Sequence, residues 1–254
     1  MQQRWPQTLW IVRHGESAGN VAHFAAQAAK AARIDINQRD VDVPLSELGV
    51  QQATTLGHWF ADMAPEERPD VLLVSPYLRA RQTAQHLDAS GGVAAAPLDR
   101  QVDERLREKE LGLLDRLTRF GIEQEYPEQA QLRQHMGKFY YRPPCGESWC
   151  DVILRLRSAL DTISLHYGGR RVLIVGHQVV VLCLRYLLEG LDEDRILEID
   201  REAEVANCGV TEYRFDPAQG PNGGLMLHRY NFTAPLSREG TPVTAEPGTQ
   251  AASR

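Results

Sequence analysis

A stretch near the amino terminus decides the fold: Leu9-Trp10-Ile11-Val12-Arg13-His14-Gly15-Glu16-Ser17, followed by Asn20. Its apolar run ends abruptly in an arginine, a histidine and a glycine. Such a run is typical of a parallel strand buried on both faces, and ligands in open α/β sheets collect beyond the carboxyl ends of the strands. An imidazole held there beside a guanidinium can attack or hold an anion. The stretch therefore predicts a site for a phosphoryl group.

Two further apolar runs, at residues 71–74 and 172–175, have the same character. Each is followed by a polar or glycine break and a helical pattern, which is the rhythm of a doubly wound sheet. Residues 93–96 predict an additional weak strand. Residues 210–215 and 225–230 alternate on either side of a Pro-Asn-Gly-Gly turn. We expect an α/β fold in a single domain, with a mainly parallel central sheet, helices on both faces and an antiparallel edge hairpin.

Capping residues indicate where the helices begin. Ser46 can cap one helix, and Ser148 forms a capping-box pattern with the aspartate three residues later. Pro76 is expected at the first helical position of another helix. Residues 178–189 predict an apolar helix directly after the third strand. The alanine-rich residues 21–33 predict a helical insertion, either a packing helix or a lid near the site.

Composition limits the class of protein. The chain has 254 residues, and its 43% apolar and 24% charged content is ordinary for a globule with a real core. A net charge of -6 argues against a nucleic-acid partner, and no apolar run is long enough to span a bilayer. Neither a signal-peptide core nor a disulfide pattern is evident. We expect a cytoplasmic protein with no membrane partner, with a catalytic domain at 1–234 and a disordered tail at 235–254. The sequence leaves the assembly state open, a homodimer included.

Five polar blocks follow one another along the chain. They are Arg13-His14-Gly15-Glu16 with Asn20 and the continuation Asp42-x-Pro44-Leu45-Ser46; Ser75-Pro76-x-x-Arg79-Ala80-x-Gln82-Thr83; Leu106-Arg107-Glu108-x-x-x-Gly112; Gly146-Glu147-Ser148; and Gly176-His177. A lone Arg-His-Gly is a weak indication, but the ordered set is specific. In this order the blocks resemble the histidine phosphatase superfamily, which includes the cofactor-dependent phosphoglycerate mutases.

The resemblance implies a role for each charged residue of the site. Arg13 and Arg79 hold phosphoryl oxygens, for which planar guanidinium forks are suited, and Asn20 adds a neutral donor to the substrate. His14 is the nucleophile and forms a phosphohistidine. His177 stands opposite and stabilises charge in the transition state. Glu108 protonates the leaving oxygen and then deprotonates the attacking water. Guanidinium and imidazole groups supply the positive field, so neither a metal nor another cofactor is expected.

Some of these roles have competing candidates. Arg81 could exchange roles with Arg79. The acidic neighbours of Glu108 could replace it as the acid; they are Asp103, Glu104 and Glu110. The remaining histidines have no ligand-like spacing.

Cys208 and Arg214 have the CxxxxxR spacing of cysteine-dependent phosphatases. That mechanism needs a loop of backbone amides around the phosphate, running into a helix. The residues between Cys208 and Arg214 alternate like a strand instead. We interpret the spacing as a coincidence.

The segment between Glu108 and Ser148 bears on the substrate. Phosphoglycerate mutases need a pair of adjacent arginines there, and the sequence offers only Arg133, between Leu132 and Gln134, with no such pair. The segment is similar to the fructose-2,6-bisphosphatase branch, in which positions matching Arg133, Lys138 and Gln178 bind the second phosphate and the sugar. Two positions depart from that branch: Leu182 replaces an arginine and Arg119 a tyrosine. The basic residues of the segment either rim the site, where they would attract a multiply anionic substrate, or form a solvated helix face.

We predict an enzyme that hydrolyses small phosphomonoesters, sugar phosphates among them, through phospho-His14. A phosphotransferase of the mutase type is the first alternative. The second is a phosphate-binding or interaction module that has lost turnover. The expected partner is a small phosphorylated metabolite.

Overall fold

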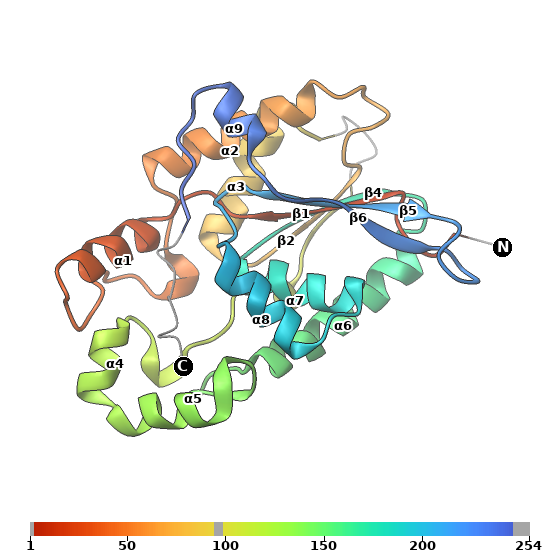
Figure 1. Ribbon diagram of the computed structural model, residues 1–254. Helices are drawn as coiled ribbons and strands as arrows, with labels where there is room; N and C mark the ends of the chain where they lie inside the picture. The colour runs from red at the N-terminus through yellow and green to blue at the C-terminus, as the bar shows by residue number, and fades with distance from the viewer. Residues whose placement is uncertain (1–2, 94–98, 246–254) are drawn as a thin grey trace.

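Six strands form one sheet in the order β3-β2-β4-β1-β5-β6 (Figure 1). The computed structural model describes residues 3–93 and 99–245. The strands are β1 (Thr8–Arg13), β2 (Val71–Val74), β3 (Asp99–Val102), β4 (Arg171–Gly176), β5 (Val210–Asp216) and β6 (Gly224–Phe232). The first four pair in parallel, whereas β5 runs antiparallel to both β1 and β6. The expected mainly parallel sheet with an antiparallel edge hairpin is confirmed. The weak strand expected at 93–96 falls largely on residues 94–98, outside the described residues.

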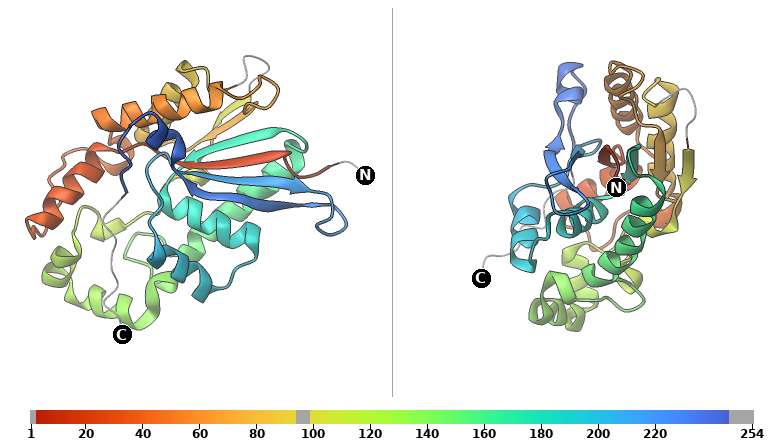
Figure 2. Two further views of the ribbon diagram at one scale, coloured as in Figure 1. Left: turned by 45° about the horizontal axis from the view of Figure 1, so that its top comes forward. Right: turned by 90° about the vertical axis from the view of Figure 1, so that its right-hand side faces the viewer.

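Helices cover both faces of the sheet (Figure 2). On one face lie α2 (Glu47–Ala61), α3 (Leu78–Ala89) and α9 (Ala234–Arg238), and on the other α6 (Trp149–His166), α7 (Gln178–Glu189) and α8 (Glu193–Glu202). Beyond the carboxyl end of β1 lie α1 (Ala18–Ala28), α4 (Arg119–Glu125) and α5 (Pro127–Tyr140). Three short 3-10 helices are η1 (Asp40–Asp42), η2 (Glu104–Leu106) and η3 (Gly112–Leu114). Within the described ranges, no helix has the length and apolar content to cross a membrane.

The alternation of side chains along β1 divides the core into two layers. Leu9 and Ile11 pack with residues of α6, α7 and α8. Trp10 and Val12 point to the opposite face and pack with residues of α2, α3 and α9. Because successive residues of a strand face opposite sides, a continuous apolar run suits a strand covered on both faces. The sheet is therefore fixed between two apolar layers, and its carboxyl edge is held in place.

Most helix starts agree with the sequence. Ser46 caps α2 by accepting from the Gly49 amide, Ser148 and Asp151 form the predicted capping box of α6, and α7 spans the predicted residues 178–189. The prediction for Pro76 is wrong, because α3 begins at Leu78.

The reason is the hydroxyl of Ser75. It lies 2.7 Å from Nε2 of His177 and accepts from the Tyr77 amide at 3.3 Å. Ser75 and Pro76 therefore belong to the turn that leads into α3. The alanine-rich insertion forms a helix only as far as Ala28. Beyond the helix, Arg33 forms an isolated antiparallel β-bridge with Leu117.

The carboxyl-terminal segment is folded in its described part. Helix α9 buries Leu236, and the carbonyl of Pro242 accepts from the side chain of Gln52. Thr244 donates through its hydroxyl to the side chain of Asn207 at 3.0 Å. The disorder expected for 235–254 therefore does not hold for 235–245, because these residues find apolar and polar partners on the sheet domain. Residues 246–254 lie outside the described residues.

Two glycines let the loop after β1 approach the start of α2. A Cβ on Gly49 would lie 1.9 Å from the carbonyl oxygen of Glu16, and a Cβ on Gly15 would lie 2.5 Å from the carbonyl oxygen of Gly49. Both distances are far shorter than any ordinary contact. The loop that carries His14 is thus seated directly on the backbone of α2.

We expect Gly49→Ala to destabilise the protein by about 2 kcal/mol or more, because backbone has to move to admit the methyl group. The matched control is Gly19→Ala in the first turn of α1, where the nearest atom to a new Cβ is a Val43 methyl at 3.3 Å. That variant should be neutral or slightly more stable, since alanine favours a helix over glycine. Urea denaturation of both variants measures the difference. Equal stability of the two would contradict the close packing of loop and helix.

Candidate active site

His14 follows β1 directly and is almost fully buried, with 3% of its surface exposed. Its Nδ1 lies 2.7 Å from the carbonyl oxygen of Gly15, and its Nε2 lies 3.2 Å from Nε of Arg79. A carbonyl only accepts and a guanidinium only donates, so the proton of the neutral ring is on Nδ1. Nε2 is consequently the unprotonated nitrogen, which is the form that can attack phosphorus.

Burial lowers the pKa of His14 well below the usual value of a histidine, and the positive charges of Arg79 and Arg13 lower it further. A lowered pKa means that the neutral ring persists at pH values where a free imidazole is protonated. His14 is therefore available as a nucleophile throughout the neutral range.

The backbone around His14 is held from three directions. The His14 amide donates to the carbonyl of Gly176 at 2.9 Å, and the Asn207 side chain donates to the His14 carbonyl at 3.0 Å. The Gly15 amide donates to the hydroxyl of Thr83 at 3.0 Å. The position of the imidazole is thus set by β4, by the loop before β5 and by α3 together.

His177 lies opposite His14, with a separation of 5.1 Å between the ring centroids. Its Nε2 is bound to Ser75 Oγ, and because Ser75 also accepts from the Tyr77 amide, its hydroxyl proton is free to point at the imidazole. The ring proton of neutral His177 then lies on Nδ1, which is buried and has no hydrogen-bond partner among the described residues. A buried donor without a partner is costly, so this atom suits an oxygen of a ligand. Burial, followed by the charge of Arg79, lowers the pKa of His177 well below its usual range.

Two buried arginines flank these rings. Arg13 donates through Nη1 to the carbonyl of Val205 at 2.6 Å. Arg79 turns Nε to His14 and both Nη atoms to the carboxylate of Asp40, at 2.9 and 3.2 Å. The carboxylate of Asp40 offers two oxygens to the fork, as a phosphoryl group would. A phosphoryl dianion bound by Arg79 must therefore displace Asp40 or share the guanidinium with it.

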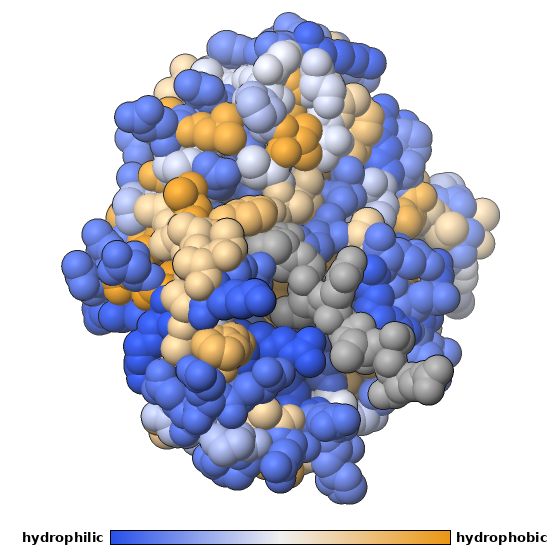
Figure 3. All heavy atoms as spheres, turned by 60° about the vertical axis from the view of Figure 1, so that its left-hand side comes forward, coloured by the Kyte–Doolittle hydropathy of each residue, from blue (hydrophilic) through white to orange (hydrophobic). Residues whose placement is uncertain are grey.

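Asn20 is buried at the start of α1. Its Oδ1 accepts from both the backbone amide and the hydroxyl of Ser17, each at 3.0 Å. The backbone amide of Asn20 donates back to Ser17 Oγ. This capping box fixes the orientation of the carboxamide and leaves its nitrogen as the donor end. Figure 3 shows the face on which α1 lies, where an apolar patch left of centre lies among mostly hydrophilic side chains. Helix α1 exposes Val21 and Phe24 on its surface.

The loop that carries Glu108 is organised by Glu147. The Glu147 carboxylate accepts from Arg107 at 2.6 Å and from Arg155 at 3.0 Å, and it also accepts from the Glu110 amide at 3.2 Å. Burial alone would raise the pKa of Glu147, but the bonds from these arginines outweigh burial and lower it. Arg155 additionally donates to the carbonyls of Arg105 and Glu108. The loop that carries Glu108 is thus fixed to the first turns of α6.

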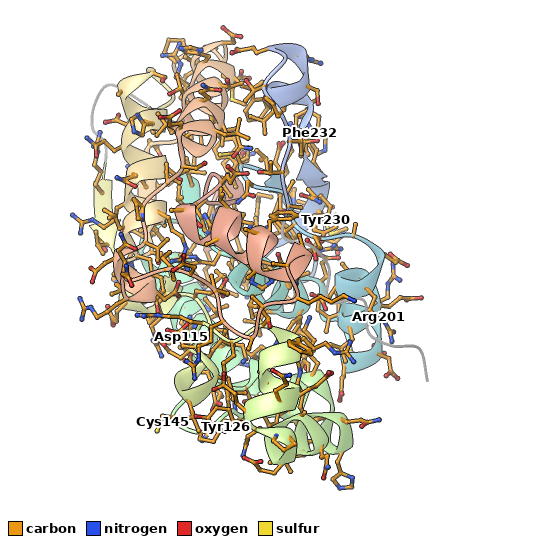
Figure 4. All side chains as sticks on the ribbon, turned by 90° about the vertical axis from the view of Figure 1, so that its left-hand side faces the viewer. Asp115, Tyr126, Cys145, Arg201, Tyr230 and Phe232 are labelled. Atoms are coloured by element: carbon orange, nitrogen blue, oxygen red, sulfur yellow. The ribbon has the colours of Figure 1, made fainter. Side chains whose placement is uncertain are left out.

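Backbone hydrogen bonds join the two ends of the chain segment that follows Glu108. The Glu147 amide donates to the Glu110 carbonyl at 2.9 Å, and the Leu113 amide donates to the Pro144 carbonyl at 2.9 Å. Gly112 has φ +55°, and a Cβ on it would lie 2.2 Å from the Pro144 carbonyl oxygen. Between these contacts the chain forms α4 and α5, and Figure 4 shows Tyr126 and Cys145 together on this side of the molecule, below α1.

The competing candidates differ in position. Arg81 is exposed, whereas Arg79 is buried against His14, so the geometry favours Arg79. Glu110 accepts from Tyr77 Oη at 2.5 Å, and the Tyr77 ring packs at 5.1 Å from that of His177. Glu110 thus approaches the site from the Tyr77 side and stays an alternative to Glu108 as the acid.

The expected substrate-binding residues of α5 and α7 have different surroundings. Lys138 forms an ion pair with the buried carboxylate of Asp200, whereas Arg133 makes no ion pair or hydrogen bond with any described residue. Gln178 begins α7 beside His177, and its Oε1 is buried without a hydrogen-bond partner in the described structure.

The structure agrees with the interpretation of Cys208 as unrelated to catalysis. Residues 210–216 form strand β5, so no phosphate loop follows the thiol. Burial raises the pKa of Cys208, which opposes formation of a thiolate.

Sequence reasoning assigned no role to several residues that hold the site. These are Asp40, Ser75, Tyr77, Thr83, Glu147, Arg155 and Asn207. Ser75 could have been found, because Val74 and Val175 are paired in the register of β2 with β4, which places Ser75 beside the end of β4. Thr83 and Glu147 lie within the polar blocks of the sequence, but nothing local shows what they contact. Asp40, Tyr77, Arg155 and Asn207 come from separate elements and carry no local pattern.

The chain is similar to known proteins over most of its length. Residues 9–222 match the histidine phosphatase superfamily (branch 1). The chain is 31% identical over 224 residues to the Caenorhabditis elegans 6-phosphofructo-2-kinase/fructose-2,6-bisphosphatase, covering 85% of this chain but only 43% of that protein. It is 29% identical over 231 residues to the probable phosphoglycerate mutase GpmB of Yersinia pestis (strain Pestoides F), covering 90% and 94%. A solved structure, mycobacterial hydrolase 1, aligns with a TM-score of 0.65 at 26% identity and covers 89% of this chain and 98% of its own.

Fold and site together define a protein built for phosphoryl transfer, in which two histidines and two arginines converge at the carboxyl edge of a mainly parallel sheet. The chain belongs to the histidine phosphatase superfamily, whose members include phosphatases and mutases.

We expect His14 to resist protonation on acidification. Its pKa lies well below the usual 6.5, so the ring is expected to stay mostly neutral at pH 6, where a free histidine is mostly an imidazolium. Long-range proton–nitrogen NMR spectra of the imidazoles, with His14 assigned by comparison with His14→Gln, report the protonation state directly. Imidazolium shifts for His14 at pH 6 would contradict the buried neutral ring.

Proposed function

We propose that this protein is a phosphatase that hydrolyses small phosphomonoesters through a phosphohistidine at His14. One observation carries the proposal: the unprotonated Nε2 of His14 lies 3.2 Å from the guanidinium of Arg79, and the centroids of the His14 and His177 rings are 5.1 Å apart. A nucleophile and donors for the phosphoryl oxygens thus occur within one buried cluster. Phosphoryl transfer requires little more than such positioning and charge stabilisation.

In the first step, Arg13, Arg79 and the Nδ1 proton of His177 bind the phosphoryl oxygens of the substrate. His14 Nε2 attacks phosphorus in line with the ester oxygen, so that a P–N bond forms as the P–O bond breaks. Glu108 gives its proton to the departing oxygen, which leaves as an alcohol. The Nδ1 contact of His14 with the Gly15 carbonyl stabilises the positive charge that develops on the ring.

In the second step, water attacks the phosphohistidine. Glu108, now a carboxylate, takes a proton from that water, and the P–N bond breaks to regenerate neutral His14. Inorganic phosphate leaves, and the proton on Glu108 is available for the next turnover. The same carboxyl group therefore serves first as an acid and then as a base.

The names of the relatives suggest phosphorylated metabolites as substrates, among them sugar phosphates. A mutase reaction is the runner-up, supported by the similarity to a probable phosphoglycerate mutase. We favour hydrolysis because the 109–146 segment contains no pair of adjacent arginines to bind a glycerate. A phosphate-binding module without turnover is less favoured, because a nucleophile, cations and candidate acids are all present.

We expect His14→Ala to abolish hydrolysis of p-nitrophenyl phosphate, because the other imidazole of the cluster, that of His177, has its unprotonated nitrogen engaged by Ser75. An acid-labile phosphoenzyme should form in the wild type on brief incubation with a phosphorylated substrate and be absent in the variant. Arg157→Gln, which changes an exposed residue of α6, is the control and should retain both properties. Labelling of His14→Ala equal to that of the wild type would refute His14 as the nucleophile. A phosphoglycerate exchange assay on the wild type would reveal a mutase.

We expect Glu108→Gln to slow alkyl phosphates far more than p-nitrophenyl phosphate. An alkoxide needs a proton in order to leave, whereas nitrophenolate does not, and general acid catalysis contributes roughly 10²–10⁴-fold. The ratio of kcat values for glycerol 2-phosphate and p-nitrophenyl phosphate measures the difference. Glu66→Gln, which changes an exposed glutamate remote from this loop in the sequence, is the control and should leave the ratio unchanged. An equal loss on both substrates in Glu108→Gln would transfer the role to Glu110 or Glu104.

A further inference from the structure

Asp40 holds one end of the Arg79 guanidinium. Nη1 of Arg79 donates to the carbonyl oxygen and to Oδ1 of Asp40, at 2.6 and 2.9 Å, and Nη2 donates to Oδ2 at 3.2 Å. A guanidinium has five N–H groups, one on Nε and two on each Nη. Asp40 therefore uses three of the five, all of them at the far end of the side chain.

The donors that Asp40 does not use lie along one edge of the guanidinium. They are the N–H of Nε and the second N–H of Nη2, which point in parallel because the group is planar. Such an edge can bind an oxyanion through two bonds: in α7, Arg185 uses Nε and Nη2 to bind the carboxylate of Glu189, at 2.7 and 3.0 Å. In Arg79 the edge begins at the atom that contacts His14, because Nε lies 3.2 Å from His14 Nε2. The edge is thus directed at the nitrogen that attacks in the proposed reaction.

Other contacts keep both residues in place. Asp40 belongs to the 3-10 helix η1, where its carbonyl also accepts from the amide of the buried residue Val43 at 3.4 Å. The ring of Tyr77 packs against the guanidinium, with its centroid 5.0 Å from the central carbon. The side chain of Arg79 is 6% exposed, whereas that of Asp40 is 43% exposed. Solvent therefore screens part of the charge of Asp40, while its hydrogen bonds still fix the orientation of Arg79.

A phosphoryl group can share the guanidinium with Asp40 without movement of either residue. Binding along the Nε–Nη2 edge leaves all three bonds to Asp40 intact, whereas displacement of Asp40 would break them. Two phosphoryl oxygens bound along this edge lie beside His14. In-line transfer depends on such alignment, and a misplacement of about 1 Å costs roughly 10²-fold in rate.

We propose that Asp40 is a positioning residue that turns the Nε–Nη2 edge of Arg79 toward His14, where this edge binds two oxygens of the phosphoryl group during its transfer. The inference rests on the proposed function, because it takes the transferred group as the ligand of Arg79. Asp40 acts on that group through Arg79, so its contribution is the same for every leaving group. This separates its role from that of Glu108, which depends on the leaving group.

Replacement of Asp40 by asparagine tests the role. The new side chain has one acceptor oxygen and cannot accept from both Nη atoms, so kcat for p-nitrophenyl phosphate should fall about ten- to hundredfold. The loss should lie in kcat more than in KM, because the alignment matters most in the transition state. The ratio of kcat values for glycerol 2-phosphate and p-nitrophenyl phosphate should stay as in the wild type, in contrast to Glu108→Gln. Asp35→Asn, which removes the same charge from an exposed residue between α1 and α2, is the matched control and should leave kcat unchanged.

A double-mutant cycle shows whether Asp40 acts through Arg79. Arg79→Lys keeps the positive charge but has no planar fork to orient. In that background Asp40→Asn should reduce kcat by about twofold at most, because two residues that act as a unit are not additive. A purely structural role of Asp40 would instead reduce kcat by the same factor in both backgrounds.

The outcomes separate this proposal from the phosphatase assignment. If the wild type hydrolyses p-nitrophenyl phosphate and Asp40→Asn keeps its kcat, the positioning role is overturned and the assignment stands. The same holds if Asp40→Asn gains activity through a lower KM, which is the result expected of a carboxylate that competes with the substrate for Arg79. Equal losses in the two backgrounds would also overturn the role.

If no phosphomonoester is hydrolysed, the assignment fails, and calorimetric binding of orthovanadate and inorganic phosphate decides the role of Asp40. Orthovanadate imitates the five-coordinate phosphorus of the transition state, whereas phosphate does not. Asp40→Asn should therefore lower the affinity for orthovanadate about tenfold relative to that for phosphate, a ratio in which the change of charge largely cancels. An unchanged ratio would overturn the positioning role.

Discussion

The parallel pairing of β1 with β4 is the constraint on which the site depends. Its register places Arg13 beside Gly176, and the His14 amide continues the ladder by donating to the Gly176 carbonyl. The two catalytic imidazoles of the proposed mechanism follow these paired residues and meet at the edge of the sheet. A slip of one residue would turn the side chains of β1 to opposite faces, so the two apolar layers that fix the register also fix the distance between the rings.

The electrostatic character of the site follows from burial. An arginine does not lose its proton, so burial leaves Arg13 and Arg79 charged while it keeps His14 and His177 neutral. The guanidiniums are partly satisfied by the Val205 carbonyl and by the Asp40 carboxylate. Donors already fixed in place lose little energy to reorganisation when a charged group arrives, which is the condition for strong stabilisation of a transition state.

The sheet, most helix starts and the order of the polar blocks could be predicted, because each of them depends on a short local pattern of the sequence. The supporting contacts could not, since each joins distant segments. Asn207 reaches the His14 carbonyl across 193 residues, and Ser75 meets His177 across 102 residues. The second of these also explains the error at Pro76, because the hydroxyl of the preceding Ser75 is bound to the His177 imidazole and the Tyr77 amide, and α3 begins only at Leu78. The tail was misjudged for a similar reason: composition says nothing of the partners that Thr244 finds on the sheet domain.

The closed base of the segment that carries α4 and α5 has a consequence for how this scaffold diversifies. Its two ends are joined by backbone hydrogen bonds between Glu110 and Glu147 and between Leu113 and Pro144, which do not depend on side chains inside the segment. Evolution, or a designer making chimeras, can exchange everything between those ends while Glu108 keeps its place. Exchange of this one segment can then change the range of substrates, while the residues of the proposed reaction stay the same.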